Sequence, residues 1–190
     1  KNARRLNNSR LNSLTWRQVM LKETKSKAKL LHELAENLSL ELEKTLQDKL
    51  ISVCLFGSIA RGDEDLSSDI DILIIMKDLP EGLISRNLTI KNIIETIKSS
   101  PQARTLRKMN QSILISPIIL TPEEASKHPT IMLDIVDDGI ILYDRGVFLQ
   151  NILNDIKGKL RELGAQKIRT RKGWYWILKP DAKLGEEVRI

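Results

Sequence analysis

Short apolar segments that alternate with amphipathic ones limit the fold of this chain more than any other feature. Four of these segments have the length and apolar character of β-strands. They occupy residues 51–56, 69–76, 112–120 and 140–143. The first is mostly apolar and ends at Gly57, which is typical of a strand that is buried on both faces.

The amphipathic segments carry apolar side chains at every third or fourth position, which predicts helices with one buried face. These stripes occupy residues 22–50, 80–97 and 147–163. A shorter helix is predicted from Thr121, where a capping box adjoins a proline, and another over about 130–138. Helices interleaved with strands predict an α/β (α+β) fold, a small β-sheet flanked by helices over residues 30–145.

The C-terminal part differs in character. Residues 167–170 and 174–178 are extended segments on either side of Arg171-Lys172-Gly173, a sequence typical of a hairpin turn. They form either a small module with the preceding helix or an extension of the sheet. The predicted units are therefore a basic N-terminal arm, a core, and a basic C-terminal helix and hairpin module. Their boundaries are 1–29, 30–145 and 146–190.

The net charge of +6 conceals an uneven distribution of charge. Residues 1–29 carry +8 and residues 157–190 carry +6, whereas residues 30–156 carry −8. Basic ends around an acidic body favour a polyanionic partner such as tRNA or another RNA, together with a cation site in the middle. The alternative is that both ends are simply solvated Lys- and Arg-rich surfaces.

Composition excludes several classes of protein. The longest apolar runs fall far short of the roughly 20 residues of a membrane span. Cys54 is the only cysteine, so an internal disulfide framework is excluded. No secretory leader pattern is found at the start of the sequence, and we expect a cytoplasmic protein without a membrane partner.

Two carboxylates open the second predicted strand. Side chains alternate along a strand, so Asp69 and Asp71 point to one side while Ile70 and Ile72 point into the core. Two carboxylates on one face repel each other unless a divalent cation neutralises them. Ligands that are all oxygen favour Mg²⁺ or Mn²⁺. The alternative is a solvated acidic face on an edge strand.

Gly57 and Ser58 end the first predicted strand, where a helix can begin. A residue without Cβ lets a phosphate approach the backbone, and the serine hydroxyl can donate a hydrogen bond to it. Arg61 could contact the same phosphate or form a local ion pair with Asp63, Glu64 or Asp65.

The combined pattern resembles the signature of the DNA polymerase beta nucleotidyltransferase superfamily. Phe56-Gly57-Ser58 is followed, after ten residues, by Asp69-Ile70-Asp71-Ile72, and the flanking Ala60-Arg61-Gly62 is similar to its minimal nucleotidyltransferase branch. The segment from Gly173 to Asp181 is similar to the end of an uncharacterised archaeal subgroup. The resemblance implies a mixed sheet of the nucleotidyltransferase type. It also implies transfer of a nucleoside monophosphate from an NTP, with Gly57 and Ser58 holding the triphosphate and Asp69 and Asp71 as catalytic metal ligands.

One departure from the family pattern concerns the third carboxylate that the superfamily places on the next strand. Residues 112–120 contain no acid, and Ser116 is the candidate for that place. Glu123, Glu124 and Asp134 are more distant substitutes.

Two main hypotheses about function follow. The first is an Mg²⁺-dependent nucleotidyltransferase acting on RNA or a protein, and the second is a nucleotide- or RNA-binding protein that has lost transfer activity. A toxin-antitoxin component is a third.

The tail contains three consecutive aromatic residues among cations. Trp174, Tyr175 and Trp176 follow Lys167 and Arg169 closely in the sequence. Aromatic rings can stack on unpaired bases while cations neutralise phosphates, which would make this an RNA-contacting ribbon. The favoured alternative is that Trp174 and Trp176, which share a face, pack the tail onto the body.

Overall fold

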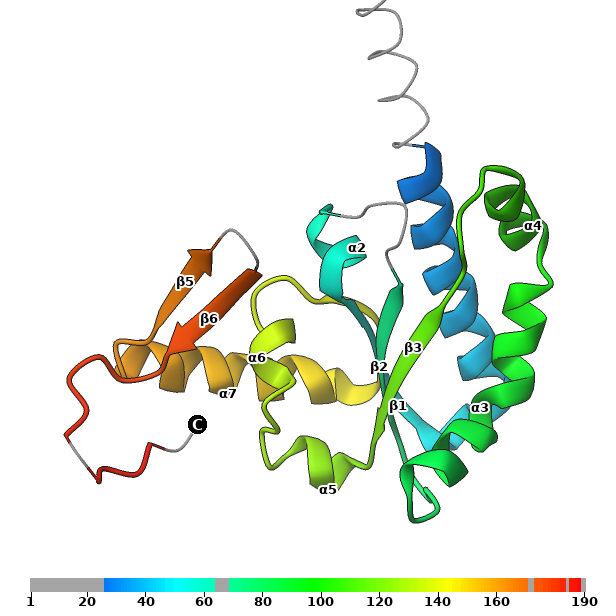
Figure 1. Ribbon diagram of the computed structural model, residues 1–190. Coiled ribbons are helices and arrows are strands. Elements are labelled where there is room, and N and C mark those ends of the chain that lie inside the picture. Colours follow the sequence, from blue (N-terminus) through cyan, green and yellow to red (C-terminus); the bar gives the residue numbers. More distant parts are fainter. Residues whose placement is uncertain (1–25, 64–68, 171–172, 184, 189–190) are drawn as a thin grey trace, which may run out of the picture.

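A four-stranded mixed sheet organises the computed structural model, which describes residues 26–63, 69–170, 173–183 and 185–188 (Figure 1). The strands are β1 (Leu50–Phe56), β2 (Ile70–Met76), β3 (Ile115–Leu120) and β4 (Ile140–Asp144). Their order is β3-β2-β1-β4, with β1 antiparallel to both of its neighbours and β2 parallel to β3. The predicted mixed α/β fold is confirmed.

One face of the sheet is covered by a helix over residues 26–46 and by α3 (Leu83–Lys98) and α4 (Pro101–Lys108) (Figure 1). The long helix leads through η1 (Gln47–Lys49) into β1. Its buried leucines pack with the isoleucines of β2 and α3 in one apolar cluster. This burial of an amphipathic stripe stabilises the helix far more than the propensity of its residues does.

The other face is covered by short helices and by α7 (Figure 1). The elements are α5 (Pro122–Ala125), α6 (Met132–Ile135), η2 (Arg145–Val147) and α7 (Phe148–Glu162). Leu73 and Ile75 of β2 belong to this second cluster, whereas Ile72 and Ile74 belong to the first. Successive side chains of β2 point to opposite faces of the sheet, so residues with odd numbers share one face and residues with even numbers share the other. Asp71 therefore lies on the same face as Leu73.

Some segments differ from their predicted form. The helical periodicity does not predict α4, although Ser100 caps it by accepting a hydrogen bond from the backbone N–H of Ala103 at 3.2 Å, with Pro101 in the first turn. That Ser-Pro pair is a signal for the start of a helix.

Residues 1–25, which hold most of the predicted basic arm, lie outside the described residues, as do Arg171 and Lys172 of the predicted turn. No helix in the described ranges has the length and apolar character that a membrane span requires.

The C-terminal strands form a separate two-stranded sheet and not an extension of the main one. They are β5 (Gln166–Thr170) and β6 (Gly173–Ile177). Trp176 packs against the second apolar cluster, and its Nε1 donates a hydrogen bond to the backbone oxygen of Leu133 at 3.3 Å. Lys167 lies over the Trp174 ring at 4.7 Å. The prediction that this tail packs on the body is confirmed for Trp176.

The two faces of the hairpin predict opposite effects of substitution. Trp176→Ala should lower the free energy of unfolding by about 2 kcal/mol, because it removes packed apolar area and a hydrogen bond. Tyr175 points the other way and is 51% exposed, so Tyr175→Ala should change it by less than about 0.5 kcal/mol. Urea unfolding of both variants measures these changes. Equal losses of stability in the two variants would contradict packing of the hairpin through the face that carries Trp176.

The start of α5 is fixed by an ion pair that makes stability depend on pH. Glu124 completes the capping box with Thr121 and accepts two hydrogen bonds from Arg86, at 2.7 and 2.8 Å. Arg86 holds the pKa of Glu124 below its ordinary value of 4.5. The ionised carboxylate therefore stabilises the folded protein fully at pH values above 4.5. This stabilisation is lost as the pH falls through the lowered pKa of the folded state.

Glu124→Gln keeps the cap but removes the charge, and should lower stability at pH 7 by about 1 kcal/mol after solvent screening is allowed for. The difference from the wild type should disappear in acid, as measured by urea unfolding at a series of pH values. Glu95→Gln is the matched control, because Glu95 is 62% exposed and its ion pair with Lys98 spans 3.9 Å. If Glu124→Gln remained less stable than the wild type in acid, its lower stability would not come from the loss of the Glu124 charge.

Candidate active site

The two predicted metal ligands lie at the start of β2. Asp69 directly precedes the strand and Asp71 is its second residue, opposite Phe56 of β1 and Ser116 of β3. Both carboxylates are half-buried, while Ile70 and Ile72 between and after them are fully buried. The predicted alternation of acidic and core side chains is therefore present.

Gly57 brings the end of β1 against this acidic pair. It begins α2 (Gly57–Arg61) with a φ of +78°, a conformation that L side chains rarely adopt. A Cβ atom on Gly57 would overlap Oδ2 of Asp71 and lie only 3.0 Å from its Cγ. The Gly57-Ser58 turn and the Asp71 carboxylate are thus packed together, although residues 59–70 separate them in sequence.

The electrostatic surroundings of Asp71 favour a bound cation. Burial raises the pKa of the Asp71 carboxyl, and the neighbouring Asp69 carboxylate raises it further. Arg61 opposes both effects with its positive charge. A divalent cation would stabilise two half-buried carboxylates that lie this close together, and their oxygen-only donor set fits Mg²⁺ or Mn²⁺.

Ser116 occupies the strand position expected for a third carboxylate. It pairs with Asp71 in the parallel β2–β3 register, and its hydroxyl donates to Oδ2 of Asp69 at 3.4 Å. Within the described residues, no cluster of three or more His, Cys, Asp or Glu side chains is arranged to hold a metal ion. At this strand position the described structure thus has a hydroxyl in contact with Asp69 and not a third carboxylate.

The proposed substitutes for that acid lie in different places. Leu120 ends β3 opposite Ile75, so Glu123 and Glu124 follow the strand at the end of the sheet away from Asp71. Glu124 is also engaged by Arg86. Asp134 on α6 is the one whose charge reaches Asp71, where it raises the pKa of that carboxyl.

Arg61 and Asp63 link the site to the hairpin. Nε of Arg61 lies 3.5 Å from Oδ2 of Asp63, so the predicted local ion pair is confirmed for Asp63, and Glu64 and Asp65 lie outside the described residues. Nη2 of Arg169 on β5 lies 3.1 Å from the same Asp63 oxygen. No local signal in the sequence predicts this contact, because 106 residues separate its partners.

The positive charge of Arg61 also affects the pKa of Asp134. Burial raises the pKa of the Asp134 carboxyl, whereas Arg61 and Lys167 lower it. Lys167 is itself held by Asp137 and Asp138, at 3.1 and 3.0 Å. The surroundings of Asp71 therefore combine acidic side chains from β2 and α6 with a cation from α2.

Comparisons with known proteins give a family and individual relatives. Residues 36–160 match the family model described as "Nucleotidyltransferase domain". The chain is 31% identical over 149 residues to "Putative protein adenylyltransferase MJ1305" of Methanocaldococcus jannaschii, a match that covers 77% of this chain and 94% of the relative. It is 38% identical over 87 residues to "Putative protein adenylyltransferase MJ0141" of the same organism, covering 46% and 76% respectively. A solved structure titled as a putative nucleotidyltransferase from Sulfolobus solfataricus is 25% identical, covers 65% of this chain and 87% of that chain, and has a TM-score of 0.42.

Proposed function

Because the chain belongs to the nucleotidyltransferase domain family, we propose that it transfers AMP from ATP to a side-chain hydroxyl of another protein. The acceptor oxygen forms a bond to the α-phosphorus, the bond from that phosphorus to the β-phosphate oxygen breaks, and pyrophosphate leaves. The single observation that carries the proposal is the packing of Gly57 against Asp71, which supports a triphosphate bound by the Gly57-Ser58 turn next to the acidic pair.

Asp69 and Asp71 would hold the divalent cation. The fit is supported by their shared face and by the raised pKa of Asp71, which burial causes first and the nearby Asp69 carboxylate second. A bound Mg²⁺ would neutralise charge on the phosphates and polarise the α-phosphoryl group. Ser116 is a positioning residue in this scheme, because its hydroxyl contacts Asp69.

Gly57 and Ser58 would hold the triphosphate. The absence of a side chain on Gly57 leaves the backbone accessible to phosphate oxygens, and the half-exposed Ser58 can donate its hydroxyl hydrogen. Arg61 lies close enough to affect the pKa values of Asp71 and Asp134, and its cation would lower the cost of bringing a polyanion to this acidic site.

A protein acceptor is favoured over RNA by the state of the hairpin cations. Lys167 is paired with two aspartates and Arg169 with Asp63, so each already has a carboxylate partner with which a phosphate would compete. The names of the two relatives, which denote protein adenylyltransferases, support the same acceptor class.

The acceptor class can be tested with labelled nucleotides. Purified protein is incubated with Mg²⁺, a lysate of the source organism and each NTP radiolabelled at the α-phosphate. We expect label from ATP in a band that protease removes and ribonuclease leaves intact, and no such band with Asp71→Asn. A labelled product that ribonuclease removes would instead establish RNA as the acceptor.

A further inference from the structure

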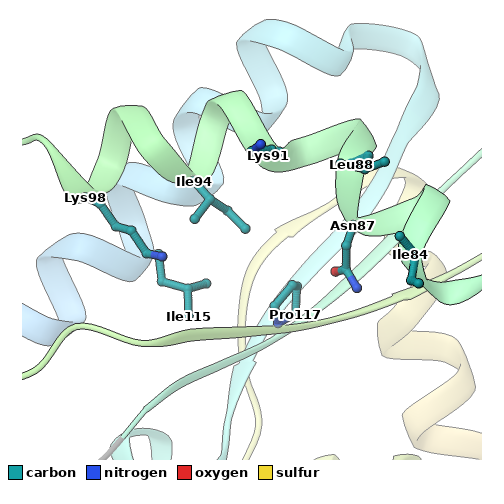
Figure 2. A pocket seen from close by; sticks show the side chains of 8 residues that line it. All are labelled: Ile84, Asn87, Leu88, Lys91, Ile94, Lys98, Ile115 and Pro117. Atoms are coloured by element: carbon teal, nitrogen blue, oxygen red, sulfur yellow. The ribbon is translucent and has the colours of Figure 1, made fainter.

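An apolar groove runs between α3 and the outer edge of β3. It encloses about 430 Å³ and is lined by Ile84, Asn87, Leu88, Lys91, Ile94, Lys98, Ile115 and Pro117. Figure 2 shows Ile94 and Asn87 pointing from α3 toward the strand, while Ile115 and Pro117 point from the strand toward the helix. The lining therefore combines an aliphatic floor with two lysines.

Large apolar side chains are exposed around this groove. Ile84 is 78% exposed and Leu88 is 60% exposed. Leu83, next to Ile84 in the sequence, and Leu114, next to the lining residue Ile115, are also exposed. Four of the nine exposed large apolar side chains among the described residues therefore line the groove or directly adjoin its lining in the sequence. A concentration of this kind on a soluble domain marks an interaction surface.

The edge of the sheet limits what can bind there. β3 is the outer strand of the four-stranded sheet, so no further strand of that sheet covers it. Pro117, in the middle of β3, has no backbone N–H to donate. The occupant must therefore bind mainly through side chains and not as an added strand.

The charge of this surface indicates the chemistry of the occupant. Residues 83–108, which span α3 and α4, contain six Lys or Arg residues and one acid, Glu95, although residues 30–156 as a whole carry −8. Arg86 is neutralised by Glu124, whereas Lys91 and Lys98 line the groove, and Lys98 makes a loose contact of 3.9 Å with the exposed Glu95. Apolar side chains flanked by carboxylates complement such a surface.

The groove is lined by the same strand, β3, that carries Ser116 of the candidate active site. Ile115 and Pro117 line it from one face of β3, and Ser116 between them points to the other face, where it contacts Asp69. A protein seated in the groove would lie one strand away from the carboxylates. It could present a hydroxyl to them around the open edge of β3.

We propose that the groove between α3 and β3 docks the acceptor protein, through an apolar segment of that protein flanked by acidic residues. This inference rests on the proposed function and names the surface that selects its acceptor. Leu88 supplies apolar contact, and Lys91 and Lys98 supply the charge that orients the acidic flanks.

The test compares labelling of the acceptor band by the wild type and by Leu88→Glu, in subsaturating lysate with ATP labelled at the α-phosphate. Leu88→Glu should slow labelling at least about tenfold, since it places a repelled charge at the centre of the interface. Leu40→Glu is the matched control, because Leu40 is 62% exposed and lies on the helix over residues 26–46, outside the groove lining. It should label within about twofold of the wild type. Mg²⁺-dependent ATP binding, measured by calorimetry, should be equal in all three proteins.

Photo-cross-linking and a charge-reversed variant extend the test. A benzophenone amino acid at position 88 should cross-link the band that carries AMP, and the same amino acid at position 40 should not. Lys91→Glu with Lys98→Glu should also slow labelling. Wild-type labelling by Leu88→Glu, or a cross-link from position 88 to a second copy of the chain, would overturn the docking inference alone. A wild type that labels no protein while binding ATP would overturn the proposed function and this inference with it.

Discussion

Asp71→Asn is expected to lower AMP transfer by at least about a thousandfold while leaving the protein as stable as the wild type or more stable. Transfer should fall because the substitution removes one of two carboxylates that hold the cation. Stability should not fall, because burial and the Asp69 charge raise the pKa of Asp71, so ionising this carboxyl costs more in the folded protein than in the unfolded chain.

This pair of effects distinguishes a functional carboxylate from a structural one. Initial rates of labelling give the first effect, and thermal unfolding without added metal gives the second. Asp78→Asn is the matched control, because Asp78 is 68% exposed and pairs only loosely with Lys49 at 3.5 Å. It should alter neither quantity. An Asp71→Asn protein that keeps wild-type transfer, or one that unfolds more easily, would contradict the assigned role.

Gly57→Ala is expected to reduce transfer at least about a hundredfold, because the new methyl group must displace the Asp71 carboxylate. It should also lower the free energy of unfolding by about 1–3 kcal/mol, since alanine is strained at a φ of +78°. Steady-state labelling and urea unfolding measure the two effects.

Gly62→Ala separates strain from displacement. Gly62 has a φ of +71°, but nothing lies within 4 Å of the position that its Cβ would take. The variant should lose about 1 kcal/mol of stability from backbone strain and should keep transfer activity within about twofold. Equal losses of activity in the two variants would mean that contact with Asp71 is not the reason for glycine at position 57.

The sequence allowed the sheet and the acidic pair to be predicted because both depend on local periodicity. Alternating burial along β2 follows from the period of a strand, and it determines on its own that Asp69 and Asp71 share a face. The capping box at Thr121 is likewise a local pattern, and the structure confirms it. Helix α4 was missed because its residues are largely polar and only Ser100 and Pro101 mark its start.

Contacts between distant segments could not be predicted in this way. The link between Asp63 and Arg169 depends on the placement of the hairpin by Trp176 packing, which no local pattern encodes. The same holds for Asp134, whose proximity to Asp71 comes from the packing of α6 on the sheet. Ser116 could be named from the resemblance to the family pattern, which expects a carboxylate on the next strand, but its contact with Asp69 required the register of β3.

The most direct test of the proposed reaction compares ATP labelled at the α-phosphate with ATP labelled at the γ-phosphate, each incubated with the protein, Mg²⁺ and lysate. We predict that the α-label enters a protein, that the γ-label is released as pyrophosphate, and that Asp69→Asn and Asp71→Asn abolish both events. Entry of the γ-label into a protein band that appears with the wild type and not with Asp71→Asn, or ATP binding without transfer of the α-label to any acceptor, would contradict nucleotidyl transfer at this site.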